Sequence, residues 1–73
     1  MARLEIFKKG ARTGEYTLLA GETVIGRERG VQVRLDDHIV SRRHARVVPA
    51  DGAWVVEDLN TRNGTYVNGQ REF

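Results

Sequence analysis

A chain of 73 residues accommodates one small domain, and its 12 Lys and Arg against 10 Asp and Glu give a net charge of +2. The sequence has no cysteine and only two histidines, which excludes a disulfide framework or a structural metal centre as the stabilising element. A small apolar core must therefore hold the fold alone, with little margin over the conformational entropy of the chain.

The N-terminal segment, residues 1–12, alternates apolar with charged residues and contains no apolar run. This pattern predicts neither a signal peptide nor a transmembrane helix. We therefore expect a soluble protein with no membrane partner. Because the chain has no cysteine, a reducing compartment suits it, and we expect a cytoplasmic location.

Apolar residues recur at every second position along the chain, as at Val31, Val33 and Leu35. This period is typical of β-strands, whereas a helix repeats its apolar face at a longer spacing. In chain order, the pattern predicts strands over residues 3–8, 15–19, 23–27, 31–35, 45–48, 53–58 and 65–67.

Turn-forming residues separate the predicted strands, beginning with residues 9–14. The pairs Asp51-Gly52 and Asn68-Gly69 predict tight hairpins, because the turns that match strand twist require positive φ. Connections this short favour antiparallel pairing, since parallel strands need long crossovers. The sequence therefore predicts an all-β fold, an antiparallel β-sandwich of two packed sheets.

Three loops at strand ends concentrate arginine and polar residues: Gly26-Arg27, residues 36–44 and residues 60–69. If the sandwich brings these loops to one end, their charged, hydroxyl and amide donors would converge on a single anion. The candidates for this site are Arg27, Ser41, Arg42 and Asn63. A phosphorylated threonine fits such a site, because it carries about −1.5 to −2 charges and three acceptor oxygens. Arginine makes up 10 of the 12 basic residues, and its planar fork pairs well with phosphate.

The sequence resembles the forkhead-associated (FHA) domain family in three ordered blocks. They are Gly26-Arg27, Ser41-Arg42-Arg43-His44 and Asn63-Gly64-Thr65-Tyr66-Val67-Asn68-Gly69, which match the family signature GR, SxxH and NGTxxNG in order and separation. The resemblance implies a single FHA domain over residues 1–73, which binds a phosphothreonine-containing protein or peptide. It would mediate phosphorylation-dependent protein–protein interaction in signalling, with no enzymatic activity, no cofactor and no metal.

The resemblance also assigns roles to the phosphopeptide-binding residues. Arg27 would pair with the phosphate, and Ser41 would donate its hydroxyl to a phosphate oxygen. Arg42 would add a charged or backbone contact, and Asn63 would hold the peptide main chain. Arg62 stands where the family often has threonine, and it would either widen the basic rim, favouring acidic residues in the peptide, or point into solvent. Preference for threonine over serine is implied by the family alone.

Further residues of the blocks would support the site structurally. By the resemblance, Gly26 and His44 belong to the scaffold, with the histidine bracing the binding loops through hydrogen bonds. Gly64 lies in the asparagine loop, and Asn68 and Gly69 form the hairpin turn already predicted from their φ preference.

An enzyme is one alternative, with Ser41 as nucleophile and His44 as base. Activation of a serine also needs an orienting acid and an oxyanion hole, and no glycine elbow surrounds Ser41. The sequence therefore predicts no catalytic residue.

A small basic nucleic-acid-binding domain is the second alternative, with phosphates contacted by Arg27, Arg29, Arg34, Arg42, Arg43, Arg46 and Arg62. Such modules stack bases on clustered aromatic rings. The aromatic residues here are scattered, and Trp54 and Tyr16 occupy strand positions typical of a core. We therefore expect no nucleic-acid partner.

FHA domains continue beyond the second Asn-Gly turn with further strands, some of which pair with the first strand. By the resemblance, this chain is C-terminally truncated, and residues 4–7 keep an unpaired edge that invites association. Three explanations stay open: a fragment of a longer protein, strand exchange with a second copy, or completion by another polypeptide. We expect a fragment that self-associates through this strand.

Overall fold

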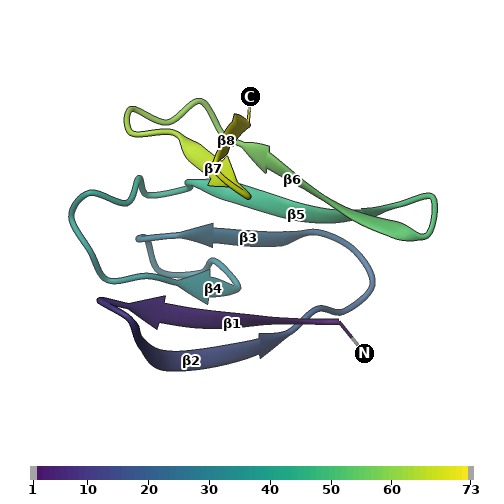
Figure 1. Ribbon diagram of the computed structural model, residues 1–73, viewed down its shortest axis with the longest axis horizontal. Helices are drawn as coiled ribbons and strands as arrows, with labels where there is room; N and C mark the ends of the chain where they lie inside the picture. Colours follow the sequence, from purple (N-terminus) through teal and green to yellow (C-terminus); the bar gives the residue numbers. More distant parts are fainter. Residues whose placement is uncertain (1, 73) are drawn as a thin grey trace.

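The computed structural model describes residues 2–72, which form an all-β fold of eight strands without a helix (Figure 1). In chain order the strands are β1 (Arg3–Lys8), β2 (Ala11–Thr17), β3 (Thr23–Gly26), β4 (Val33–Arg34), β5 (Ala45–Ala50), β6 (Ala53–Asp58), β7 (Thr65–Val67) and β8 (Gln70–Glu72). The predicted all-β class is confirmed. Met1 and Phe73, which the predicted domain over residues 1–73 includes, lie outside the described residues.

The strands form three hydrogen-bonded sheets. A four-stranded sheet in the order β4-β3-β5-β6 occupies the centre, and the hairpins β1-β2 and β7-β8 make a two-stranded sheet each. In Figure 1 the central sheet lies between the two hairpins, with β1-β2 on the side of β4 and β7-β8 on the side of β6. Residues 2–72 therefore form three sheets, where the sequence predicted two.

One strand pair runs parallel, against the expectation of antiparallel pairing throughout. β3 and β4 pair Ile25 with Val33 and Gly26 with Arg34 in parallel. The pairing is only two residues long, so a loop closes it without the crossover helix that longer parallel strands need. The side-chain Oε1 of Gln32 in this loop accepts a hydrogen bond from the backbone N–H of Val24 at 2.8 Å. The strand predicted over residues 31–35 is therefore shorter in the structure, where β4 contains only Val33 and Arg34.

Three two-residue hairpin turns join adjacent strands. Asp51 and Gly52 have φ of 49° and 78°, and Asn68 and Gly69 have φ of 51° and 84°, which are the positive values expected from the sequence. Lys9 and Gly10 form a third such turn, with φ of 53° and 80°. Because this turn needs only two residues, β2 begins at Ala11 and not at residue 15 as predicted. A β-bulge interrupts the β1-β2 pairing between Ile6 and Phe7.

The core is small and built from short side chains of the central sheet, together with Leu18, which directly follows β2. Its buried apolar residues are Leu18, Val24, Val33, Ala45 and Val47. Trp54 is 38% exposed, so its predicted core position is wrong. Trp54 lies on β6, an edge strand of the central sheet that pairs with β5 alone among the described strands, and the neighbouring β7-β8 hairpin leaves part of its side chain exposed. Tyr16 on β2 is half-buried.

Within residues 2–72, β1 forms ladder hydrogen bonds to β2 alone, so its other edge has no strand partner there. The half-buried Leu4 and Ile6 face Ile25 and Val33 of the central sheet across an open groove of about 260 Å³. Phe7 is 60% exposed at the same hairpin. The unpaired edge that the sequence predicted over residues 4–7 is therefore present on the side of β1 that faces away from β2.

Candidate functional site

The site begins where the segment around Ser41 crosses the end of β3. The backbone N–H of Arg27 donates to the carbonyl oxygens of Ser41 and Arg42 at 3.1 and 3.0 Å, and the N–H of Glu28 donates to that of Arg42 at 3.1 Å. A Cβ placed on Gly26 would lie 2.1 Å from the carbonyl oxygen of Arg42. Only glycine therefore permits this close approach of two backbone segments.

His44 joins this crossing to the asparagine loop. Its Nδ1 accepts a hydrogen bond from the backbone N–H of Ser41 at 3.0 Å. Nδ1 therefore carries no proton, and Nε2 donates to the carbonyl oxygen of Gly64 at 2.9 Å. The backbone of His44 is itself bonded on both sides, its N–H to Ile25 and its carbonyl oxygen to Leu59. These contacts give the imidazole the geometry of a brace between two loops.

Asp58, at the end of β6, shapes the asparagine loop from the other direction. Its carboxylate accepts hydrogen bonds from the N–H of Thr61 at 2.9 Å, the hydroxyl of Thr61 at 2.6 Å and the hydroxyl of Thr65 at 2.7 Å. The Thr61 hydroxyl in turn accepts from the N–H of Gly64 at 2.9 Å. These bonds, the Thr61 hydroxyl above all, lower the pKa of Asp58 from 3.8 to about 2.

Asp58 and Thr61 were not among the residues predicted to support the site. Their spacing of three residues is the signal that was available, because an Asp followed by a Thr at that distance often closes a local turn through side-chain to backbone bonds. Asn60 between them adopts a positive φ of 61°.

Two predicted ligand residues, Arg27 and Asn63, meet at the backbone just before Ser41. Nε of Arg27 donates to the carbonyl oxygen of Val40 at 2.9 Å, and Nδ2 of Asn63 donates to that of Ile39 at 2.7 Å. The two side chains thus hold adjacent peptide units of one loop. With Nε committed to the loop, the two terminal nitrogens of Arg27 are the groups that remain for an anion.

Ser41 and Arg42 line a common pocket of about 390 Å³ with Glu28 and Arg43. Two cations and a hydroxyl around one hollow suit an anion with several acceptor oxygens. Glu28 and Arg43 were not among the predicted site residues, although they directly adjoin the Gly26-Arg27 and Ser41-Arg42 pairs. Among the described residues, Arg27 and Asn63 are outside the four that line the pocket, and they contact its loop from the side.

Arg62 is exposed next to Asn63. It therefore lies on the rim of the loop cluster, the loops of residues 27–28, 36–44 and 60–64 at the end of β3. The sequence had left two roles open for Arg62, a basic rim or a solvent-exposed side chain. Of the supporting residues, Gly26 lies at the crossing of β3, Gly64 accepts from His44, and Asn68 and Gly69 form the turn between β7 and β8.

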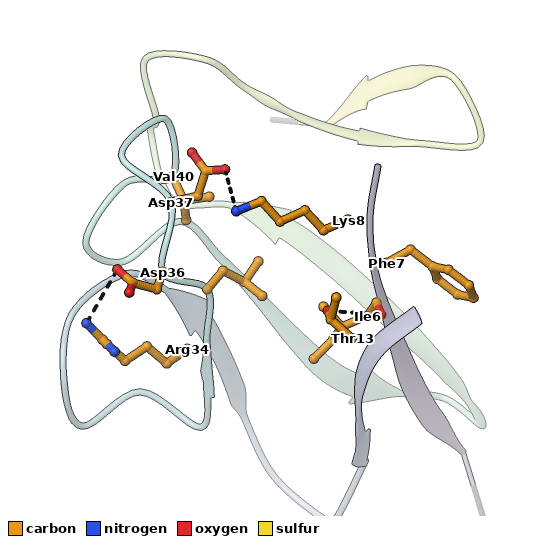
Figure 2. Close-up of a pocket in the computed structure, with 9 residues that line it drawn as sticks. Ile6, Phe7, Lys8, Thr13, Arg34, Asp36, Asp37 and Val40 are labelled. Atoms are coloured by element: carbon orange, nitrogen blue, oxygen red, sulfur yellow. Dashed lines mark hydrogen bonds and ion pairs between the residues drawn. The ribbon is translucent and has the colours of Figure 1, made fainter. Parts of the chain in front are cut away.

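A larger hollow of about 420 Å³ lies between the β1-β2 hairpin and the loop that follows β4 (Figure 2). Its charged side chains pair with each other: Lys8 Nζ lies 3.8 Å from an Asp37 carboxylate oxygen, and Arg34 Nη2 lies 3.8 Å from one of Asp36. Val40 lines this hollow, whereas its neighbour Ser41 lines the anion pocket. The loop thus separates an apolar hollow with balanced charges from a basic pocket, and the basic pocket is the better anion site.

Over residues 2–72, no group of three or more His, Cys, Asp or Glu side chains is arranged to hold a metal ion. In the same part of the chain, no helix has the length and apolar character needed to cross a bilayer.

Residues 23–71, more than half of the chain, match the model of the FHA domain family. Among curated proteins, the FHA domain-containing protein FhaB of Mycolicibacterium smegmatis is 39% identical over 69 residues, which cover 93% of this chain and 44% of that protein. This chain therefore spans less than half the length of that relative.

The solved structures to which this chain is similar are also FHA domains. The FHA domain of FhaA, in complex with the intracellular domain of Rv3910, has a TM-score of 0.74 at 38% identity over 86% of this chain and 66% of that chain. A structure from a study of phosphothreonine-dependent FHA domain interactions has a TM-score of 0.78 at 35% identity over 94% of this chain and 69% of that chain.

Proposed function

Because the chain belongs to the FHA domain family, we propose that it binds phosphothreonine in partner proteins and so mediates phosphorylation-dependent protein–protein interaction in signalling. The observation that carries the proposal is the pocket in which Ser41, Arg42 and Arg43 gather. Its donors match the charge and the acceptor oxygens of a phosphate. One similar FHA domain comes from a study of phosphothreonine-dependent interactions, and another is bound to a protein partner.

We assign the contacts as follows. The Ser41 hydroxyl and the Arg42 side chain contact the phosphate from within the pocket. The terminal nitrogens of Arg27 reach it from the side, since Nε is held on Val40. Asn63, anchored on the same loop, holds the peptide main chain. Arg62 extends the basic rim, and Gly26, His44, Gly64, Asn68 and Gly69 support the loops.

Titration of the chain with matched peptides tests the proposal. Three peptides of one sequence, carrying phosphothreonine, phosphoserine or bare threonine, are compared by calorimetry. We expect binding of the phosphothreonine peptide, weaker binding of the phosphoserine peptide, and none of the bare peptide. Equal binding of all three by a folded chain would exclude phosphate recognition.

We further propose that the domain is not an enzyme. A serine nucleophile needs a base within reach of its hydroxyl. Here Nδ1 of His44 accepts from the backbone N–H of Ser41, and Nε2 donates to Gly64, so both ring nitrogens are occupied by backbone groups. Ser41→Ala should remove phosphopeptide binding, and detectable hydrolysis of a test ester by the original chain would contradict the assignment.

A phosphoprotein, and not a nucleic acid, is the partner we propose. Among the described residues, the large exposed aromatic side chains are Phe7 on β1, Trp54 on β6 and Tyr66 on β7, and none of them lines the anion pocket with its arginines. A nucleic-acid site combines such rings with the cations that contact the phosphates. If any oligonucleotide bound with an affinity that falls steeply with salt, and phosphorylation of a peptide made no difference, the nucleic-acid alternative would replace ours.

We also propose that the free edge of β1 pairs with a second copy of the chain. An unpaired edge offers its N–H and carbonyl groups to another strand, and the exposed Phe7 adds apolar surface there. Sedimentation over a wide concentration range tests this, and a monomer throughout would exclude it. Because the chain has no cysteine, which suits a reducing compartment, we propose a cytoplasmic setting for these interactions.

A further inference from the structure

The anion pocket contains one acidic side chain among its basic ones. Glu28 lines it together with Ser41, Arg42 and Arg43. Its backbone is fixed at the pocket wall, since its N–H donates to the carbonyl oxygen of Arg42 at 3.1 Å. Its position therefore follows from the same crossing that places Ser41.

The Glu28 carboxylate faces one of the two pocket arginines. Its Oε1 lies 4.0 Å from Nη1 of Arg43, and the two side chains are 37% and 56% exposed. A pair this long and this exposed contributes little net free energy. Arg43 can therefore exchange Glu28 for another anion, and Glu28 can exchange Arg43 for another cation.

A carboxylate that lines the anion pocket weakens the binding of every anion there, because like charges repel at the distances across one pocket. The penalty is smaller for a ligand that brings its own cation to the carboxylate. Specificity is a difference of affinities, so a repulsive group that only one class of ligand neutralises selects that class.

We propose that Glu28 is a specificity-determining residue that selects phosphothreonine peptides with an arginine or lysine close to the phosphothreonine. Before binding, Glu28 holds Arg43. On binding, the basic side chain of the peptide pairs with Glu28, and Arg43 turns to the phosphate as an additional cation. This inference rests on the proposed function and names the substrate class of the same pocket.

Glu28 acts separately from Arg62, whose charge would favour acidic residues in the peptide. Asn63, the neighbour of Arg62, is anchored on the carbonyl oxygen of Ile39, ahead of Ser41. Glu28 is anchored on that of Arg42, after Ser41. Arg62 and Glu28, which have opposite charges, therefore adjoin different parts of the loop around Ser41: Arg62 lies near the segment before Ser41 and Glu28 near the segment after it.

A positional peptide series tests the proposal. A phosphothreonine peptide of alanines receives a single arginine at each of the three positions on either side, and binding to the chain is measured by calorimetry. We expect one position at which arginine raises the affinity about threefold, the size of an exposed ion pair. Glu28→Gln should remove this gain and bind the alanine peptide more tightly, and Glu28→Lys should transfer the gain to a glutamate at that position.

Two control variants isolate the effect. Glu22→Gln removes an acid of similar exposure, 43% against 37% for Glu28, that pairs with Arg46 and lies outside the pocket lining. Arg3→Gln removes an exposed arginine on β1, outside the pocket lining. Both should keep the arginine preference, and its loss in either would overturn the assignment to Glu28.

The outcomes also separate this inference from the proposed function. If the chain binds the phosphothreonine peptides but shows no arginine preference, or keeps that preference in Glu28→Gln, the role of Glu28 is wrong and the proposed function stands. If the folded chain binds none of the phosphothreonine peptides, both are overturned.

Discussion

The loop cluster at the end of β3 and the β1-β2 hairpin are held in place by different forces. In the loop cluster, side chains and backbone groups satisfy one another: His44 joins Ser41 to Gly64, and Asp58 holds Thr61. At the hairpin, apolar side chains of β1 face an open groove and one strand edge has no partner within residues 2–72.

This difference separates two properties of the molecule: the loops at the end of β3 position the ligand-binding groups, and the β1-β2 hairpin offers a surface for association. Directional hydrogen bonds set the positions of the ligand-binding groups, because each bond fixes a distance and an angle. Apolar burial, which is not directional, supplies the stability of the scaffold. Changes in the loop cluster should therefore act on binding, and changes at the hairpin on association.

The largest effect is expected at Gly26, where one substitution should affect both phosphopeptide binding and the stability of the fold. Gly26→Ala would place a Cβ 2.1 Å from the carbonyl oxygen of Arg42, so one backbone segment must move. We expect phosphopeptide binding to be lost and the unfolding free energy to fall by about 1–3 kcal/mol, the usual cost of overpacking. Calorimetry and chemical denaturation measure the two. Gly14→Ala, in β2, where a Cβ would meet the Ile6 side chain at an ordinary contact distance of 3.5 Å, is the control for the loss of a glycine and should keep binding.

Arg27→Ala should affect binding with less effect on the fold. Each hydrogen bond to a charged group contributes roughly 1.5–3 kcal/mol, so the phosphopeptide dissociation constant should rise at least about tenfold. The change also removes the bond to Val40, so the circular dichroism spectrum is recorded alongside the titration. Arg3→Ala, an exposed arginine on β1, is the matched control. An unchanged dissociation constant in a folded Arg27→Ala variant would refute the assignment of Arg27.

Asp58→Asn tests the loop network through its pH dependence. The pKa of Asp58 is lowered in the folded chain from 3.8 to about 2, so its stabilisation is complete above 3.8 and is lost as the pH falls toward 2. We expect the variant to be less stable at neutral pH and to show a smaller loss of unfolding free energy in that window. Asp51→Asn, in the β5-β6 turn, is the control for replacing an aspartate outside this hydrogen-bond network.

The smallest effect on stability and binding is expected at the hairpin. Phe7→Lys replaces an exposed apolar side chain with a charge beside the free edge, so it should weaken self-association and leave phosphopeptide affinity unchanged. Sedimentation and titration measure the two. Tyr66→Lys on β7 changes a side chain of the same 60% exposure and should leave association as it was. Equal effects of both variants would show that general surface hydrophobicity, and not the edge of β1, drives association.

Much of the fold could be predicted because it is local. The alternation of apolar residues predicted seven strands, each of which overlaps an observed strand, and the Asn-Gly and Asp-Gly pairs predicted two hairpins through their φ preference alone. The strand β8, which is only three residues long, was not predicted from the alternation, and Trp54 was wrongly predicted to be a core residue. Period-two alternation cannot tell a covered strand from an edge strand, since both repeat alike.

The all-β class and two of the hairpin turns follow from the sequence, because they depend on the conformational preferences of neighbouring residues, and the three motif blocks that identify the family are read from it directly. The parallel pairing of β3 with β4, the approach of Gly26 to Arg42, and the pocket that Glu28 and Arg43 share with Ser41 are set by tertiary packing. These features join residues far apart in the chain, and the packing of the loops over the end of β3 sets which side chains meet.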